Sequence, residues 1–284
     1  MTSVAQAAAI APPIHIAIRP ARPRLRDELL DFWQHRELCY FLAWRDVKVR
    51  YKQTVLGVAW AVLQPALTMI VFTLFFGHLA HMPSDGVPYP LFAYAGILPW
   101  SLMAAGVSAS SGSIIGSPTL ITKVYFPRMI IPASAVFSGL VDFAVAVVGL
   151  CALMWRYHVA VTPYILLSIP VVLLTLLLSC AVGGWLAAVT VRYRDIRYVV
   201  PFFMQLWMFG TPVFYPASLV PPGKWRLILA LNPMATFTDA FRSAWVGRAP
   251  DPAPLALATA VTLIVFAVAV RTFRSFERTF ADYI

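Results

Sequence analysis

RYKQTVLGVAWAVLQP, residues 50–65, begins with cationic side chains and ends in an apolar run, with a Leu-Gly pair between the two halves. A cationic strip directly before an apolar run is typical of a chain that enters a membrane from the cytoplasmic side. Gly57 tolerates backbone angles that other residues resist, so the chain can turn there. Pro65 removes a backbone hydrogen bond inside the apolar run. We therefore predict that a loosened first membrane span begins after this turn.

The composition of the whole chain also points to a bilayer. The chain has 284 residues, of which 60% are hydrophobic and 12% are charged, whereas soluble domains carry about 25% charged residues and about 45–50% apolar ones. Several windows exceed the ~18 nearly uncharged apolar residues that mark a spanning helix. The three cysteines are far apart and form neither a disulfide framework nor a metal-ligand spacing. The composition predicts an all-α integral membrane protein.

The hydropathy pattern predicts one transmembrane domain at 24–284, preceded by a flexible tail at 1–23. An amphipathic helix at 24–48 places bulky aromatics opposite charges, which is typical of a helix that lies in the membrane interface. Six spans follow, near 58–80, 90–112, 130–154, 162–189, 198–215 and 254–272.

Two short segments separate the fifth and sixth spans: KWRLILALNP at 224–233 and TFTDAFRSAW at 236–245. Apolar runs of ~10–14 residues suit re-entrant or interfacial helices better than full spans. We predict short re-entrant or periplasmic helices here, at the outer mouth of a pathway. A plain extracytoplasmic cap is the alternative.

The net charge of +10 is unevenly distributed along the chain. Most of the 22 Lys and Arg residues lie before the first span, in the loops after spans two and four, and in the C-terminal tail. By the positive-inside rule, these segments and both termini are predicted to be cytoplasmic. The charge is therefore interpreted as membrane orientation and not as nucleic-acid binding.

Signatures of enzymes are missing from the sequence. It has no GxxxxGK[ST] loop, so we do not expect this chain to bind a nucleotide, and it has no HExxH, GxSxG or Cys/His cluster. One ionisable residue, Asp142, lies inside a predicted span, where a carboxylate is costly unless it is paired, protonated or facing water. We expect it to bond to a Ser, a Thr or Gln205; a proton relay is the alternative.

An ordered series of motifs resembles a known family. WRDVKVRYKQTVLGVAWAVLQP is followed by KVYFPR at 123–128, VRYRDIRYVVP at 191–201, and TPVFYP and LNPM at 211–216 and 231–234. This series resembles the permease subunits of ABC-2 type exporters, and it is most similar to the branch that exports lipid-linked polysaccharides such as O-antigen, more distantly capsule or teichoic acid. The resemblance covers the chain from about residue 28 to its end.

The resemblance implies a homodimer of this chain with two copies of an ABC ATPase, in a bacterial inner membrane. No cofactor is expected on this chain, because ATP and Mg²⁺ would bind the partner subunit. The loop 113–128, called the coupling segment below, would rest on the ATPase. Its candidate coupling residues are Ser117, Pro118, Thr119, Lys123, Tyr125 and Arg128; for Lys123 and Arg128 the alternative is a role in orientation only.

The resemblance also implies a substrate, a glycan linked to a polyprenyl diphosphate. Its anionic headgroup would meet the cationic strip and the turn after it, at Arg45, Lys48, Arg50, Tyr51, Lys52, Leu56 and Gly57. Attraction of ordinary anionic lipids is the alternative for these cations.

The sugar body of such a substrate suits a pathway of aromatic and uncharged polar side chains. Candidates for the channel lining are Trp60, Gln64, Phe72, Phe75, Phe76, Phe202, Phe203, Gln205, Trp207 and Tyr215. Packing against lipid explains aromatic residues equally well.

Two other functions compete with polysaccharide export. An ABC-2 type exporter of a small hydrophobic molecule or drug would need the basic strip less. A membrane-embedded glycosyltransferase or acyltransferase of the envelope would need converging acids or a His/Asp pair, which the sequence does not display.

Overall fold

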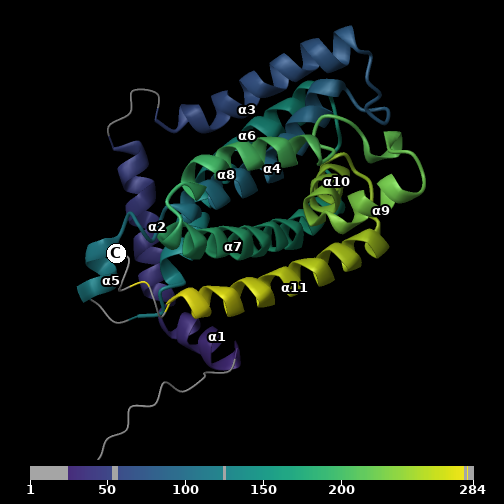
Figure 1. The fold of residues 1–284 in the computed structure, drawn as a ribbon. Helices are drawn as coiled ribbons and strands as arrows, with labels where there is room; N and C mark the ends of the chain where they lie inside the picture. Colours follow the sequence, from purple (N-terminus) through teal and green to yellow (C-terminus); the bar gives the residue numbers. More distant parts are fainter. Residues whose placement is uncertain (1–24, 53–56, 124–125, 278–279, 281–284) are drawn as a thin grey trace, which may run out of the picture.

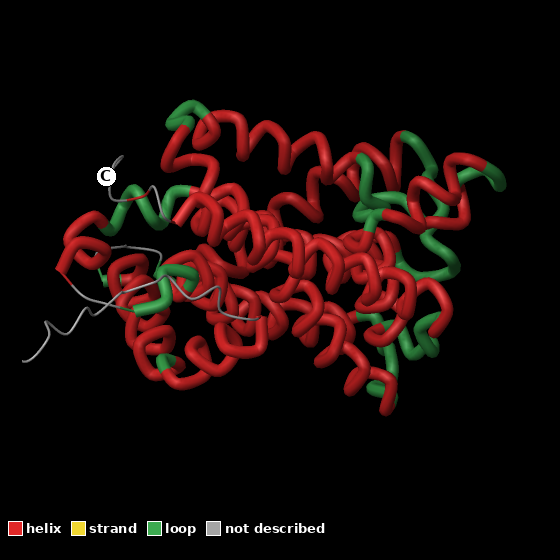
Figure 2. Tube along the Cα trace, turned by 60° about the horizontal axis from the view of Figure 1, so that its bottom comes forward, coloured by secondary structure: helices red, strands yellow, loops and turns green. Residues whose placement is uncertain are grey.

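The computed structural model describes residues 25–52, 57–123, 126–277 and 280, and all regular elements in these ranges are helical. Figure 1 shows long helices side by side, and Figure 2 shows the loops gathered at the two ends of this bundle. The elements are α1 (Leu25–Gln34), α2 (Arg36–Tyr51), α3 (Ala59–Phe72), the π-helix η1 (Thr73–Leu79), α4 (Tyr89–Ser111), α5 (Pro118–Lys123), α6 (Ile130–Arg156), η2 (Pro163–Leu167), α7 (Ser168–Arg192), α8 (Ile196–Phe209), η3 (Ala217–Leu219), α9 (Lys224–Leu231), α10 (Pro233–Trp245) and α11 (Pro252–Glu277). The predicted tail at 1–23 lies outside the described residues.

Five segments in the described part of the chain are long and apolar enough to cross a membrane, and they match five of the six predicted spans. They are Ala59–Leu79, Tyr89–Ser111, Ile130–Arg156, Pro163–Arg192 and Pro252–Glu277. The span predicted at 198–215 corresponds to α8, which has only 14 residues. At ~1.5 Å per residue α8 is shorter than the ~30 Å hydrocarbon core. The helix ends at Phe209, and Gly210 and the following TPV sequence form a turn.

α4 forms the centre of the bundle. It packs against α6 and α7 on either side and against α10, α3 and α8. In its most apolar window 78% of the residues are buried, against 6% in the window that covers α3 and η1. The first span is therefore attached loosely to the side of the bundle, along its outer edge in Figure 1.

The predicted interfacial helix is two helices. α1 and α2 are separated at His35, whose backbone angles (φ −96°, ψ 18°) leave the helical region. α2 runs on to Tyr51 and crosses the ends of the spans instead of running along them (Figure 1). Its buried Cys39 and Leu42 pack with Ile114, Ile121 and Ile130, while its exposed side carries Tyr40, Phe41 and Trp44.

The two ends of the bundle carry different short helices. α5 lies at the same end as α2 and the last turns of α11, whereas α9 and α10 lie at the opposite end (Figure 1). The two segments between α8 and α11 form the helices α9 and α10. α9 is largely exposed, but most of α10 is buried against α4, α7 and α11.

Candidate functional site

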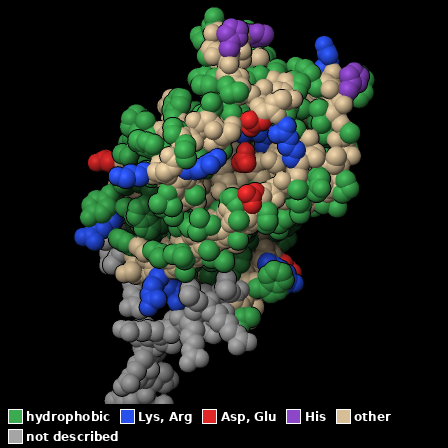
Figure 3. Space-filling view, turned by 90° about the vertical axis from the view of Figure 1, so that its right-hand side faces the viewer, with side chains coloured by type: hydrophobic (Ala, Val, Ile, Leu, Met, Phe, Trp, Pro, Cys, Tyr) green, Lys and Arg blue, Asp and Glu red, His purple; other side chains and the backbone are tan. Residues whose placement is uncertain are grey.

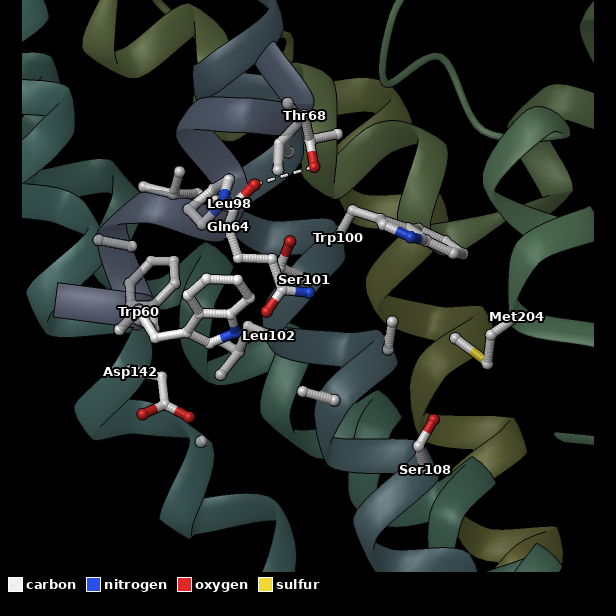
Figure 4. A pocket seen from close by; sticks show the side chains of 18 of the residues that line it. Trp60, Gln64, Thr68, Leu98, Trp100, Ser101, Leu102, Ser108, Asp142 and Met204 are labelled. Atoms are coloured by element: carbon white, nitrogen blue, oxygen red, sulfur yellow. Dashed lines mark hydrogen bonds between the residues drawn. The ribbon is translucent and has the colours of Figure 1, made fainter. Parts of the chain in front are cut away.

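A cavity of about 1010 Å³ lies between α3, α4, α6 and α8. Its walls are aromatic, aliphatic and uncharged polar side chains, with Trp60 and Gln64 from α3, Trp100 and Ser101 from α4, and Met204 from α8. Figure 4 shows Trp60 and Asp142 close together on one side of this space, with Met204 across from them. Among the described residues that line it, the ionic side chains are Arg50 and Asp142.

Arg50, Tyr51, Ser138 and Asp142, called the mouth cluster, connect the end of α2 to the middle of α6. Arg50 Nη1 and Tyr51 Oη both donate to the Asp142 carboxylate, one to each oxygen. Arg50 Nη2 donates to Ser138 Oγ at 3.3 Å. The predicted partner of Asp142 is therefore wrong: its partners are Arg50 and Tyr51 from α2, and Gln205 is a further residue of the cavity lining. This contact could not be predicted from local sequence patterns, because 92 positions separate Arg50 from Asp142.

The other cations of the strip lie outside the cavity lining. Arg45 forms an ion pair with Asp46 at 2.8 Å, Lys48 Nζ lies 5.7 Å from the centre of the Trp44 ring, and Lys52 is exposed. Gly57 lines the cavity with φ 43°, so the expected glycine turn is present. Leu56 lies outside the described residues.

The predicted channel residues divide into two groups. Trp60, Gln64 and Gln205 line the cavity. The others do not: Phe72 stacks on Phe76 and Phe214, Phe75 and Phe202 are exposed on the surface, Phe203 packs on Trp207, and Tyr215 donates to the Phe209 carbonyl.

Several lining residues were missed by the sequence reasoning. They include Thr68, Trp100, Ser101, Ser108, Phe143, Met204 and Phe214. Ser101 and Ser108 are seven positions apart, so they fall on one face of α4, and this spacing could have identified α4 as a lining helix.

At the opposite end of the bundle, a buried arginine connects three segments. Arg242 of α10 is 4% exposed and donates through Nε to the Phe92 carbonyl, and through Nη2 to the carbonyls of Pro212 and Val213 at 2.8 Å each. Its guanidinium lies 3.7 Å from the centre of the Phe92 ring. Burial lowers the pKa of Arg242 to about 10, and the nearby Asp239 opposes that shift. Arg242 therefore remains a cation at neutral pH.

Asn232 holds the same turn from a second direction. Its Oδ1 accepts from Trp207 Nε1 and from the backbone N–H of Met234, which caps α10. Its Nδ2 donates to the Gly210 carbonyl and to Thr211 Oγ1. Asn232 and Arg242, together with the turn at 210–213, are called the outer clamp below.

The surface of this end differs from the apolar sides. Acidic and basic side chains gather near its middle among apolar ones (Figure 3). Arg248 Nη2 donates to the Asp85 carbonyl at 2.6 Å, and Ser218 Oγ donates to the Asp85 carboxylate. Burial raises the pKa of the neighbouring Asp239, which Arg242 partly opposes. In the residues described, no group of three or more His, Cys, Asp or Glu side chains could hold a metal ion.

The coupling segment contains a short helix, α5, that begins at Pro118, a residue well suited to a helix start. Ser117 precedes it, and Thr119 and Lys123 are exposed. Arg128 is engaged within the chain: Nη1 donates to the Glu277 carbonyl at 2.9 Å and Nε lies 3.8 Å from the Glu277 carboxylate. Tyr125 lies outside the described residues.

Comparison with known proteins assigns these features to one family. Residues 37–246 match the protein family described as "ABC-2 type transporter". The O-antigen export system permease protein RfbA of Myxococcus xanthus is 33% identical, over 89% of this chain and 98% of that protein. A protein of the same name from Klebsiella pneumoniae is 23% identical over 84% of this chain and 91% of its own length. The polysialic acid transport protein KpsM of Escherichia coli is 24% identical, over 80% and 90%.

Proposed function

The chain belongs to the ABC-2 type transporter family, and we propose that it forms half of the pathway through which an ATP-driven exporter moves a polyprenyl-diphosphate-linked O-antigen. Its role as the membrane permease of a polysaccharide exporter, and not as an enzyme, follows from its relatives. The cargo, the subunit arrangement and the roles of individual residues are the content of the proposal.

The cavity is the observation that carries this proposal. A sugar polymer needs a path on which hydroxyl groups and ring faces find partners without a tight site. Trp60 and Trp100 offer aromatic faces, and Gln64, Ser101 and Gln205 offer uncharged hydrogen-bonding groups. The charge is confined to the mouth cluster, where Arg50 suits the diphosphate of a lipid headgroup. A small hydrophobic cargo would have no use for that cation.

The exposed apolar faces support a homodimer. Trp60, Leu67 and Phe75 on the first span and Phe202, Leu206 and Phe209 on α8 are all largely exposed, and α3 and α8 both border the cavity. A second copy packed against these helices would cover them and enclose the pathway. In this arrangement α8 and the turn after it serve as a sixth, short span, and α9 and α10 form the outer mouth.

The energy comes from an ABC ATPase partner, as the family implies. In the proposed complex two ATPase copies bind ATP and Mg²⁺ and contact α5 through exposed Lys123. The end that carries α2, α5 and the end of α11 faces the cytoplasm, so both termini are cytoplasmic. The complex then lies in the inner membrane with the outer clamp on the periplasmic side.

Deletion of the gene, followed by complementation, tests this function. Loss of surface polysaccharide, its accumulation inside the cell, and recovery with the wild-type chain are the expected results. Normal surface polysaccharide in the deletion strain, with the ATPase subunit present, would refute the proposal.

A further inference from the structure

In the mouth cluster, the side chains that could bind an anionic headgroup already bind an anion, the carboxylate of Asp142. Arg50 Nη1 donates to one of its oxygens and Tyr51 Oη to the other. Both donors come from the last two residues of α2, whereas the carboxylate comes from the middle of α6. Each oxygen of Asp142 therefore accepts from one of these donors, as two oxygens of a bound phosphate would.

A guanidinium recognises carboxylate and phosphate by the same geometry. It presents parallel N–H donors to two oxygens of either group. Ser138, which Arg50 Nη2 contacts at 3.3 Å, donates its own hydroxyl to the Ala135 carbonyl. Arg50 is thus oriented by α6 through both Ser138 and Asp142, and the position of Asp142 is the one that a phosphate would need.

The ion pair lies where it can be exchanged. Arg50 and Asp142 both line the cavity, and their side chains are 39% and 29% exposed. Both side chains can therefore be reached by a ligand in the cavity. A carboxylate in the middle of a span is costly and usually marks a functional group. Structural support alone does not explain why the pair faces the cavity.

We propose that Asp142 is an internal competitor, which holds Arg50 and Tyr51 until the diphosphate headgroup of a lipid-linked substrate displaces it. This inference rests on the proposed function, because it assigns a step of substrate selection to the same cavity. A diphosphate carries more negative charge than the carboxylate and offers more acceptor oxygens. A phospholipid phosphodiester carries a single charge, as Asp142 does, and gains nothing by the exchange.

The consequence is selectivity at the mouth cluster. The membrane offers an excess of singly charged phospholipids, and a free Arg50 would bind them. Asp142 sets a threshold that only a multiply charged headgroup exceeds. The residue therefore determines specificity by competition, without touching the bound substrate.

The test measures binding to the purified complex of this chain and its ATPase partner in phosphatidylcholine nanodiscs. The probes are undecaprenyl diphosphate, inorganic pyrophosphate and phosphatidylglycerol. The variants are Asp142→Asn and Arg50→Gln, with Asp46→Asn as the matched control, because Asp46 pairs with Arg45 on the same helix and lies outside the cavity lining.

We expect Asp142→Asn to bind undecaprenyl diphosphate about tenfold more tightly and to bind phosphatidylglycerol, which the wild type rejects. Arg50→Gln, alone or combined with Asp142→Asn, loses the diphosphate lipid, and Asp46→Asn matches the wild type. Unchanged or weaker binding of undecaprenyl diphosphate by a folded Asp142→Asn protein would overturn the proposal. Equal affinity of the wild type for inorganic pyrophosphate and for undecaprenyl diphosphate would also overturn the proposal, because the selected ligand would then be a free diphosphate.

A second measurement needs no variant. Infrared difference spectra of the wild-type complex with ¹³C-labelled aspartate report a carboxylate that changes partners. Undecaprenyl diphosphate is expected to shift an aspartate band and phosphatidylglycerol is not; no shift at saturating diphosphate lipid refutes the exchange. If surface export depends on this chain but the exchange fails, only this inference falls, whereas normal export in the deletion strain refutes the proposed function itself.

Discussion

Gly96 and Arg242 fit against each other because Gly96 has no side chain. A Cβ placed on Gly96 would lie 2.5 Å from the Val213 carbonyl oxygen and closer still to Arg242 Nη2. The guanidinium of α10 thus passes directly over the backbone of α4 to reach the turn that ends α8. The packing of α4, α8 and α10 at this end of the bundle depends on this close approach.

The first prediction is that Gly96→Ala destabilises the protein. The new methyl group displaces either Arg242 or the turn at 212–213, and overpacking of this kind costs about 1–3 kcal/mol. Thermal unfolding in detergent measures the effect. Gly139→Ala is the control, because the nearest atom to its Cβ is 3.7 Å away; equal loss in both variants would contradict a specific role for the close approach.

The second prediction concerns Arg242 itself. Arg242→Lys keeps the charge, but its donors all lie on one nitrogen and do not reproduce the separate positions of Nε and Nη2, so we expect a loss of about 1.5–3 kcal/mol of stability. We also expect reduced surface polysaccharide, since the end of α8 is no longer held. Arg226→Lys on exposed α9 is the matched substitution. If Arg242→Lys unfolded at the same temperature as the wild type, a point charge would be sufficient to hold the turn at 212–213.

The third prediction separates the donors of Asn232 from its acceptors. Asn232→Asp keeps the oxygen that accepts from Trp207 and Met234, but it places a carboxylate against the Gly210 carbonyl in place of a donor. We expect Asn232→Asp to lower the thermal midpoint more than Asn232→Ala, because repulsion is added to the lost bonds. The reverse order would mean that the contact with the Gly210 carbonyl contributes nothing.

The sequence predicted the fold well where hydropathy alone determines it. Five spans follow from long, predominantly apolar windows. The length of α8 was overestimated, because apolar residues continue through the turn at 211–215 and hydropathy does not detect the end of the helix.

The candidate site was predicted less completely, for a different physical reason. Of the candidates for the channel lining, Trp60, Gln64 and Gln205 lie on the cavity, and their role in a channel stays a prediction, whereas Asp142 was given the wrong partner. Pairing between α2 and α6 depends on how the helices pack, and local patterns do not encode it. One sequence pattern could have indicated the outer clamp. Arg242 is close in sequence to Phe241 and Trp245, and all three are buried residues of α10.

The fourth prediction addresses coupling. Lys123→Glu on exposed α5 reverses the charge offered to the ATPase, so we expect weaker co-purification of the ATPase and less export with unchanged permease stability. Lys224→Glu, at the other end of the bundle, controls for net charge. Arg128→Gln is expected to act through stability, because Arg128 binds Glu277 within the chain. Normal ATPase binding by Lys123→Glu would remove α5 from the interface.

The fifth prediction concerns the cavity wall. Trp60→Ala removes an aromatic face from the lining, and we expect about a threefold to tenfold fall in export. Trp155→Ala is the matched control, because Trp155 is 82% exposed and outside the lining. Surface polysaccharide per permease molecule is the quantity to compare. An equal effect of both substitutions would assign Trp60 to packing against lipid.

Transport by purified components is the most direct test of polysaccharide export through this chain. The permease and its ATPase are reconstituted in liposomes with the lipid-linked polysaccharide, and the glycan that becomes accessible on the face opposite the ATPase is measured over time. We predict an ATP-dependent rise that requires both subunits and falls with Trp60→Ala. ATP hydrolysis by this chain alone, or the same rise in liposomes that lack it, would contradict the account.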